Sequence, residues 1–195
     1  MFIVKYKGKF GYIKPWTAVR DSETFSQQFL TPSIIEGMEK KIFPELLEQT
    51  GIIQKILRHK LQYDAIDMQS EMTHVRGLTK LPGKNLYTHG SYKNGAINFA
   101  PLTRGVMLNP VLYLGFGTLE DAQRASTQHL CLCRNEDIVL PKEEILEMTE
   151  EEFSALKGYE LRFGYNEQAF LVGYNRFDSN RPMYGWIECN GQTLL

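Results

Sequence analysis

The sequence contains no long apolar run. No stretch of its 195 residues approaches the roughly 20 apolar residues that a membrane-spanning helix needs. The first residues do not resemble a secretory leader, because three lysines interrupt what would have to be its apolar core: Lys5, Lys7 and Lys9. We therefore expect a soluble, cytoplasmic protein with no membrane partner.

Cysteine is scarce as well, with three residues at positions 131, 133 and 189. An odd number, two of them separated by a single residue, excludes a disulfide framework. On a strand, Cys131 and Cys133 would point to the same face, as two buried thiols do. A structural zinc site would need four well-spaced ligands, and only His129 lies nearby. No metal and no other cofactor is therefore predicted.

The common catalytic motifs are absent too. The sequence has no phosphate-binding GxxxxGK[ST] loop, no HExxH or GxSxG motif, and no GxGxxG after a strand. His59 lies in a basic strand and is interpreted as a surface or packing residue. His89 precedes Gly-Ser, as in a two-histidine phosphoesterase, but the matching second motif is missing. A metal-independent ribonuclease could use His129 with Tyr12 and Lys14, although nothing in the sequence groups these three residues.

The charge is unevenly distributed, although the net charge is only −1. Residues 1–105 contain 15 basic and 9 acidic residues, whereas residues 106–195 contain 7 and 14. This asymmetry predicts one face for a polyanion and another that faces protein or solvent, with random scatter as the alternative. Basic and aromatic residues interleave in KYKGKFGYIKPW, a mixture that suits single-stranded nucleic acid and that ordinary edge strands also carry.

Alternating apolar and polar residues predict strands over residues 2–14, 51–66 and 104–116. In the first strand, Gly8 and Gly11 indicate a bulge or a close approach of another chain segment. The second strand is expected to be basic on its outer side through Lys55, Arg58 and Lys60.

Helix signals lie between these strands. Thr31 is predicted to be an N-cap, with Pro32 at the first helical position and Pro44 ending the helix. Its buried stripe is Ile34, Ile35, Met38 and Ile42, with Glu39, Lys40 and Lys41 outside. Gly37 in mid-helix suggests that a neighbour packs tightly against it.

The second half of the chain continues the same alternation. A helix over 119–130 precedes a short strand at the two cysteines, and an acidic helix near 142–157 precedes the last strands. The order β-α-β-β-α-β predicts an α+β fold with an antiparallel sheet, ferredoxin-like or RRM-like. An all-antiparallel barrel with a helical insertion is the alternative.

Residues 67–101 differ from the rest, because they are polar, rich in glycine, and carry both basic and aromatic side chains. This segment is too long for a passive loop in a compact domain and predicts an extended β-hairpin arm that orders on a partner. The expected organisation is one domain over 1–140 that includes this arm, with a small acidic and β-rich extension over 141–195 packed on it.

Several short motifs together resemble family five of the CRISPR-associated (Cas) RAMP proteins. The first strand ends in aromatics between Phe10 and Pro15, and QFLTPS at 28–33 opens a helix that carries the family's glycine at Gly37. Thr103-Arg104-Gly105-Val106 is similar to the family's arginine-led strand, and residues 130–138 are similar to its L-x-L-G-R-S-E-D-x segment. Cys133 replaces the usual glycine and Asn135 the usual serine. The match covers residues 1–140.

This resemblance implies a non-catalytic subunit that caps the 5′ handle of crRNA in a type I Cascade-like surveillance complex. Its partners would be the crRNA, the backbone subunit and the large subunit, with target DNA and Tn7-like transposition proteins as further candidates through the complex. The arm would correspond to the family's thumb. The candidate RNA-binding residues are Lys14, Arg20, Thr31, Ser33, Arg76, Lys80, Lys84, Arg104, Arg134 and Asn135.

Two other functions stay open on the sequence alone. The subtype I-C branch of this family processes precursor crRNA itself with Tyr, Lys and His, which makes a metal-independent endoribonuclease the first alternative. No Lys-His pair follows the arm in this chain, so that activity is not carried over. The second alternative is a protein-interaction domain that binds no RNA.

Overall fold

The protein has an α+β fold, seen in a computed structural model that describes residues 1–15, 23–73, 79–80, 87–88, 100–175 and 178–191. Its helical elements are α1 (Pro32–Ile42), the short 3-10 helix η1 (Pro44–Leu46), α2 (Leu119–Ser126) and α3 (Glu150–Ala155). Within these residues, no helix is long and apolar enough to cross a membrane.

The main sheet has eight strands in the order β10-β11-β1-β9-β4-β12-β14-β13. Their bounds are β1 (Phe2–Gly8), β4 (Ile56–Gln62), β9 (Val111–Phe116), β10 (Leu130–Cys131), β11 (Ile138–Glu147), β12 (Gly158–Phe163), β13 (Phe170–Asn175) and β14 (Arg181–Asn190). The four central strands, β11-β1-β9-β4, are mutually antiparallel, with α1 between β1 and β4 and α2 between β9 and β11. This arrangement is compatible with the predicted ferredoxin-like fold.

Helices α1 and α2 cover one face of this sheet. Alternate residues of the central strands, such as Val4, Leu112 and Leu114, pack with Ile35 and Met38 of α1 and with the two buried alanines of α2. The Tyr6 hydroxyl donates a 2.8 Å hydrogen bond to the carbonyl of Ala125, which ties β1 to α2. The main core therefore lies between the sheet and these two helices.

The opposite face is covered only in part, by α3. Phe153 of α3 packs on Ile3 and Tyr113 from β1 and β9. The Lys60 ammonium donates hydrogen bonds of 3.2, 2.9 and 3.0 Å to the carbonyls of Phe153, Ser154 and Leu156. Lys60 is thus fully buried at the C-terminal end of α3, where a cation is favoured.

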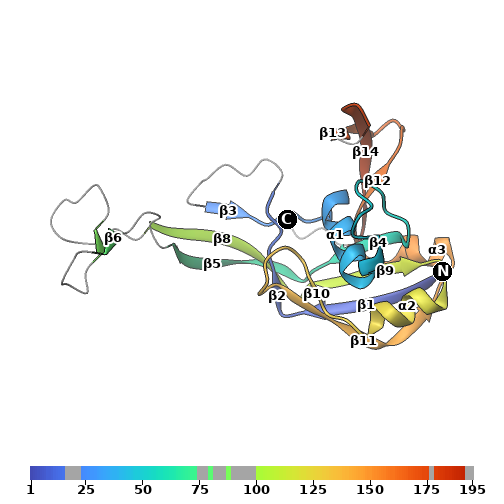
Figure 1. The fold of residues 1–195 in the computed structure, drawn as a ribbon, viewed down its shortest axis with the longest axis horizontal. Coiled ribbons are helices and arrows are strands. Elements are labelled where there is room, and N and C mark those ends of the chain that lie inside the picture. Colours follow the sequence, from blue (N-terminus) through green and yellow to red (C-terminus); the bar gives the residue numbers. More distant parts are fainter. Residues whose placement is uncertain (16–22, 74–78, 81–86, 89–99, 176–177, 192–195) are drawn as a thin grey trace.

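A long hairpin stem extends away from the main sheet (Figure 1). It consists of β5 (Ala65–Thr73) and β8 (Ala100–Leu108), which pair antiparallel along their whole length and continue β4 and β9 outward. The shorter strands β2 (Phe10–Gly11) and β3 (Glu23–Phe25) also pair with β8, and β6 (Thr79–Lys80) pairs with β7 (Tyr87–Thr88). The expectation of a hairpin is met by this stem, and most of the arm beyond it lies outside the described residues.

The C-terminal region differs from the sequence expectation. The segment 142–157 is not one acidic helix, because β11 runs to Glu147 and pairs with β1, and only α3 is helical. The Thr149 side chain and Glu152 form a capping box at the start of α3, which fixes where helix can begin. Strand β11 therefore crosses position 140, and β12, β14 and β13 extend the same sheet beyond β4.

Helix α1 begins at Pro32 after Thr31, as predicted, but two details are wrong. Glu39 is buried, because its carboxylate accepts backbone hydrogen bonds from Gln54, Lys55 and Ile56 in the segment that enters β4. Gly37 is exposed, and a Cβ atom there would meet nothing within 4 Å, so no neighbour packs against it.

Two glycines in the first segment do mark close approaches. A Cβ atom on Gly8 would lie 2.9 Å from the carbonyl oxygen of Ile138, and one on Gly11 would lie 2.4 Å from the Leu132 side chain.

The expectation that Cys131 and Cys133 are two buried thiols on one strand is wrong, since β10 ends at Cys131 and Cys133 is exposed. Among the described residues, no group of three metal-ligating side chains occurs.

Candidate nucleic-acid interface

Two of the predicted RNA-binding arginines meet at the hairpin stem, about midway along its strands. Arg104 lies on β8, and its backbone register places it on the same side of the stem as Glu71 of β5. The Arg104 Nε donates a 2.8 Å hydrogen bond to Glu71, and Arg134, in the turn before β11, donates to the other oxygen of the same carboxylate. Both guanidinium groups lie over the Tyr12 ring, 5.0 and 5.3 Å from its centroid.

Local folding explains why Tyr12 lies there. It follows β2, whose pairing with the inner end of β8 brings the first chain segment against the stem. Tyr12 itself is almost completely buried, so its ring serves as a platform for the two guanidinium groups. The cluster of Tyr12, Glu71, Arg104 and Arg134 is called the stem cluster below.

The two arginines are engaged to different degrees. Arg134 donates through Nε and Nη2 to both oxygens of Asp137, at 2.8 Å each, as well as to Glu71. Asp137 is fully buried and also accepts the Arg134 backbone N–H at 3.1 Å, so this pair fixes the shape of the turn. Arg104 keeps its two terminal nitrogens free of carboxylate partners among the described residues.

The electrostatics of the cluster hold both arginines charged. The hydrogen bond to Glu71 raises the pKa of Arg104, and the hydrogen bonds to Asp137 raise the pKa of Arg134. About a quarter of the Arg104 side chain is exposed. A partly exposed planar guanidinium whose terminal donors have no carboxylate partner can bind a phosphate group or stack on a base, which is the chemistry of an RNA contact.

The other predicted site residues in the described part of the chain do not join this cluster through any contact. Thr31 is buried, and its hydroxyl lies 3.0 Å from that of the exposed Ser33 at the start of α1. Lys14 and Asn135 are exposed, and Asn135 is the neighbour of Arg134 in the turn.

The remaining predicted residues belong to the arm and to one preceding loop. Arg20, Arg76 and Lys84 lie outside the described residues. Lys80 lies in β6, and only its backbone is described.

The three residues considered for a ribonuclease, Tyr12, Lys14 and His129, make no contact with one another in the described residues. Tyr12 is buried in the stem cluster, whereas Lys14 and His129 are exposed. No step of RNA cleavage can therefore be derived from these residues.

The sequence reasoning missed Glu71 and Asp137. Glu71 lies at the start of the polar arm, where an acid gives no signal, and only the stem register brings it to Arg104. Asp137 carried a weak signal, since an Asp three residues after Arg134 can accept the backbone N–H of a turn.

Strand β4 also carries a buried charge network that sequence reasoning placed on the outside. Arg58 is almost fully buried and donates hydrogen bonds of 2.8 and 2.7 Å to the two oxygens of Glu160 on β12. These hydrogen bonds raise the pKa of Arg58, and Arg58 holds the pKa of Glu160 below its usual range despite burial. Arg58 and Lys60 are therefore structural residues that join β4 to β12 and α3.

His59, between these two residues, points to the opposite face of the sheet, opposite Leu114. Its Nε2 atom is buried and has no hydrogen-bond partner among the described residues. Burial lowers the pKa of His59 to about 4, which favours its neutral form, and its place opposite the buried Leu114 agrees with a packing role.

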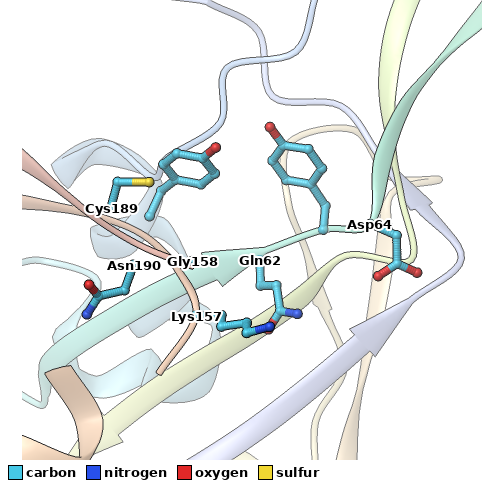
Figure 2. A pocket seen from close by; sticks show the side chains of 8 residues that line it. Gln62, Asp64, Lys157, Gly158, Cys189 and Asn190 are labelled. Atoms are coloured by element: carbon cyan, nitrogen blue, oxygen red, sulfur yellow. The ribbon is translucent and has the colours of Figure 1, made fainter. Parts of the chain in front are cut away.

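A small pocket of about 240 Å³ lies where β4, β12 and β14 meet (Figure 2). Its labelled side chains, Gln62, Asp64, Lys157, Cys189 and Asn190, come from these three strands and the segments beside them. Tyr63 and Tyr159 also line it, and their rings stack with centroids 6.0 Å apart. None of the predicted RNA-binding residues lines this pocket.

Comparisons with known proteins place the chain in no family. A scan against protein-family models finds no match, and a search of curated proteins finds none either.

Proposed function

We propose that this chain is a non-catalytic RNA-binding subunit of a type I CRISPR Cascade-like complex, similar to Cas family five, that caps the 5′ handle of the crRNA. The observation that carries the proposal is the stem cluster. Arg104 and Arg134 belong to two separate motifs of the family, yet they share one carboxylate and one aromatic ring. Independent motifs that converge on one place are expected of a binding site rather than of scattered surface charge.

Two further features support this proposal. The mostly antiparallel central sheet is compatible with the ferredoxin-like fold that a RAMP domain would have, and the hairpin stem that carries the cluster would be the base of the thumb. The Thr31-Pro32-Ser33 segment opens α1 as in the family's motif, and the exposed Ser33 in its first turn lies where a phosphate group could bind.

The arm would then contact the RNA and a neighbouring backbone subunit. The acidic C-terminal half would face the large subunit or solvent, because its charge repels phosphate. Target DNA and transposition proteins would be reached only through the assembled complex.

The test is incubation of the purified protein with its cognate repeat RNA and with a permuted RNA of the same composition, both in EDTA. We expect binding that prefers the cognate 5′ handle, without cleavage. Specific cleavage would instead identify a metal-independent endoribonuclease. Absence of binding to either RNA would leave a protein-interaction domain.

A further inference from the structure

The face of the main sheet opposite α1 and α2 holds an open groove of about 910 Å³ beyond the end of α3. Four lysines line it: Lys5 and Lys7 of β1, Lys9 after it, and Lys142 of β11. Lys7, Lys9 and Lys142 are exposed, and Lys5 lies over the Tyr113 ring, 5.4 Å from its centroid. The groove ends near Asn109, where the hairpin stem leaves the sheet.

These lysines are free of ion pairs, unlike the arginines of the protein. Each of the arginines in the described ranges pairs with a carboxylate, whereas none of the four lysines does so there. The two acids on the groove wall are already engaged. Asp64 accepts a 2.9 Å hydrogen bond from Asn109, and Glu136 lies 3.3 Å from Arg134. The groove therefore has an excess of lysines over carboxylates, and Glu143 and Glu144 lie with Lys142 on the adjoining hollow.

The groove also has apolar surface beside its charges. Ile138 and Leu140 of β11 are large exposed apolar side chains, and Val111 and Phe10 also line the groove. Lys5 and Lys7 are two residues apart on one strand, so they project from the same face about 7 Å from each other. A regular row of cations along an apolar floor suits a linear polyanion with flat apolar groups, and a single small anion would use only part of it.

We infer that this groove binds a segment of single-stranded RNA, through its phosphates and without sequence preference. The inference goes beyond the proposed handle site, since it involves none of the residues of the stem cluster. The four lysines without ion pairs among the described residues carry it, together with the exposed apolar side chains on which bases can rest.

The test is the binding of a fluorescently labelled oligouridine, followed by anisotropy over a series of salt concentrations. The variant K7E/K142E reverses two exposed groove lysines. The matched control K41E/R181E makes the same change in net charge at two exposed residues outside the groove, on α1 and β14. Thermal unfolding of both variants checks that the fold is intact, and K7Q/K142Q provides a milder second variant.

We expect K7E/K142E to lose oligouridine affinity and its salt slope to fall by about 1.4, which is about 0.7 for each lost phosphate contact. K41E/R181E should bind like the wild type, and K7Q/K142Q should fall between them. Equal binding by K7E/K142E and the control would overturn the inference, as would groove-dependent binding of polyglutamate in place of oligouridine. The preference for the handle over a permuted RNA should survive in K7E/K142E, which separates failure of this groove from failure of the handle site.

Discussion

Arg134 donates a hydrogen bond to Glu71 across 63 residues of sequence. This contact fastens the turn before β11 to the hairpin stem, and the same arginine holds the fully buried Asp137 through two hydrogen bonds. Arg134 is thus an anchor of the stem, whereas its neighbour in the cluster, Arg104, keeps donors available. This division of roles leads to distinct predictions for the two arginines.

Replacing Arg134 should destabilise the protein. Arg134→Ala leaves Asp137 buried without its partner, so we expect unfolding free energy to fall by about 3 kcal/mol in denaturant titrations. The matched control is Arg181→Ala, which breaks another pair of residues three apart, with Asp178, on the exposed surface. That loss should stay below about 1 kcal/mol. Equal effects of the two substitutions would show that the turn does not depend on Arg134.

Breaking the buried ion pair of Arg58 and Glu160 should cost more stability than breaking an exposed ion pair. Arg58→Met leaves Glu160 in the core with its main partner removed, and we expect a loss of about 3–5 kcal/mol. The double variant R58M/E160M should recover part of that loss, because Glu160 is then no longer buried without its partner. Arg124→Met, which breaks the exposed pair with Glu45, should cost less than about 1 kcal/mol. Similar losses for Arg58→Met and Arg124→Met would contradict the network.

Two glycine substitutions should change the stability of the protein in opposite directions. Gly37→Ala places a methyl group in open space on an exposed part of α1, and it should raise stability by about 0.5–1 kcal/mol. Gly185→Ala should destabilise, because its Cβ would lie 2.3 Å from the carbonyl oxygen of Arg162 on the neighbouring strand. Thermal unfolding of both variants tests this, and destabilisation by Gly37→Ala would mean that α1 has a neighbour on that side.

The lowered pKa of His59 predicts that the stability of the protein depends on pH. Its pKa is about 4 in the folded protein and near 6.5 when unfolded, so only the unfolded state binds a proton between these values. Stability should be complete above pH 6.5 and fall towards pH 4, with a slope of up to about 1.4 kcal/mol per pH unit from this residue. His59→Phe should flatten this slope, whereas His129→Gln at the surface should keep it. An unchanged slope in His59→Phe would refute the assignment.

Local pattern predicted much of the fold, because periodicity and capping act within a few residues. Thr31 and Pro32 at the start of α1 and the apolar alternation of β1 and β9 are of this kind. Strand β11 was missed because Pro141, Lys142 and the glutamates after it have no strand pattern, and its pairing with β1 overrides their preference.

Buried charge was the harder part to predict. Arg58 and Lys60 resemble a solvated strand face, and their partners, Glu160 and the carbonyls of α3, lie more than 90 residues later. The candidate site likewise contains residues that the sequence predicts and one that it does not. Arg104 and Arg134 follow from short motifs, but Glu71, which joins them, is assigned only by the register of the stem.

The most direct test of the proposed function compares two variants of the stem cluster for binding to the 5′ handle RNA. Glu71 competes with phosphate for the Arg104 guanidinium, so Glu71→Gln should tighten binding, whereas Arg104→Gln should weaken it and lower the salt slope by about 0.7. A purely structural cluster would show the same direction for both variants, since each removes one side of the same ion pair. Anisotropy titrations with the handle RNA that move in opposite directions are the predicted result. Affinities that fall equally, or that both match the wild type, would contradict an RNA site at this cluster.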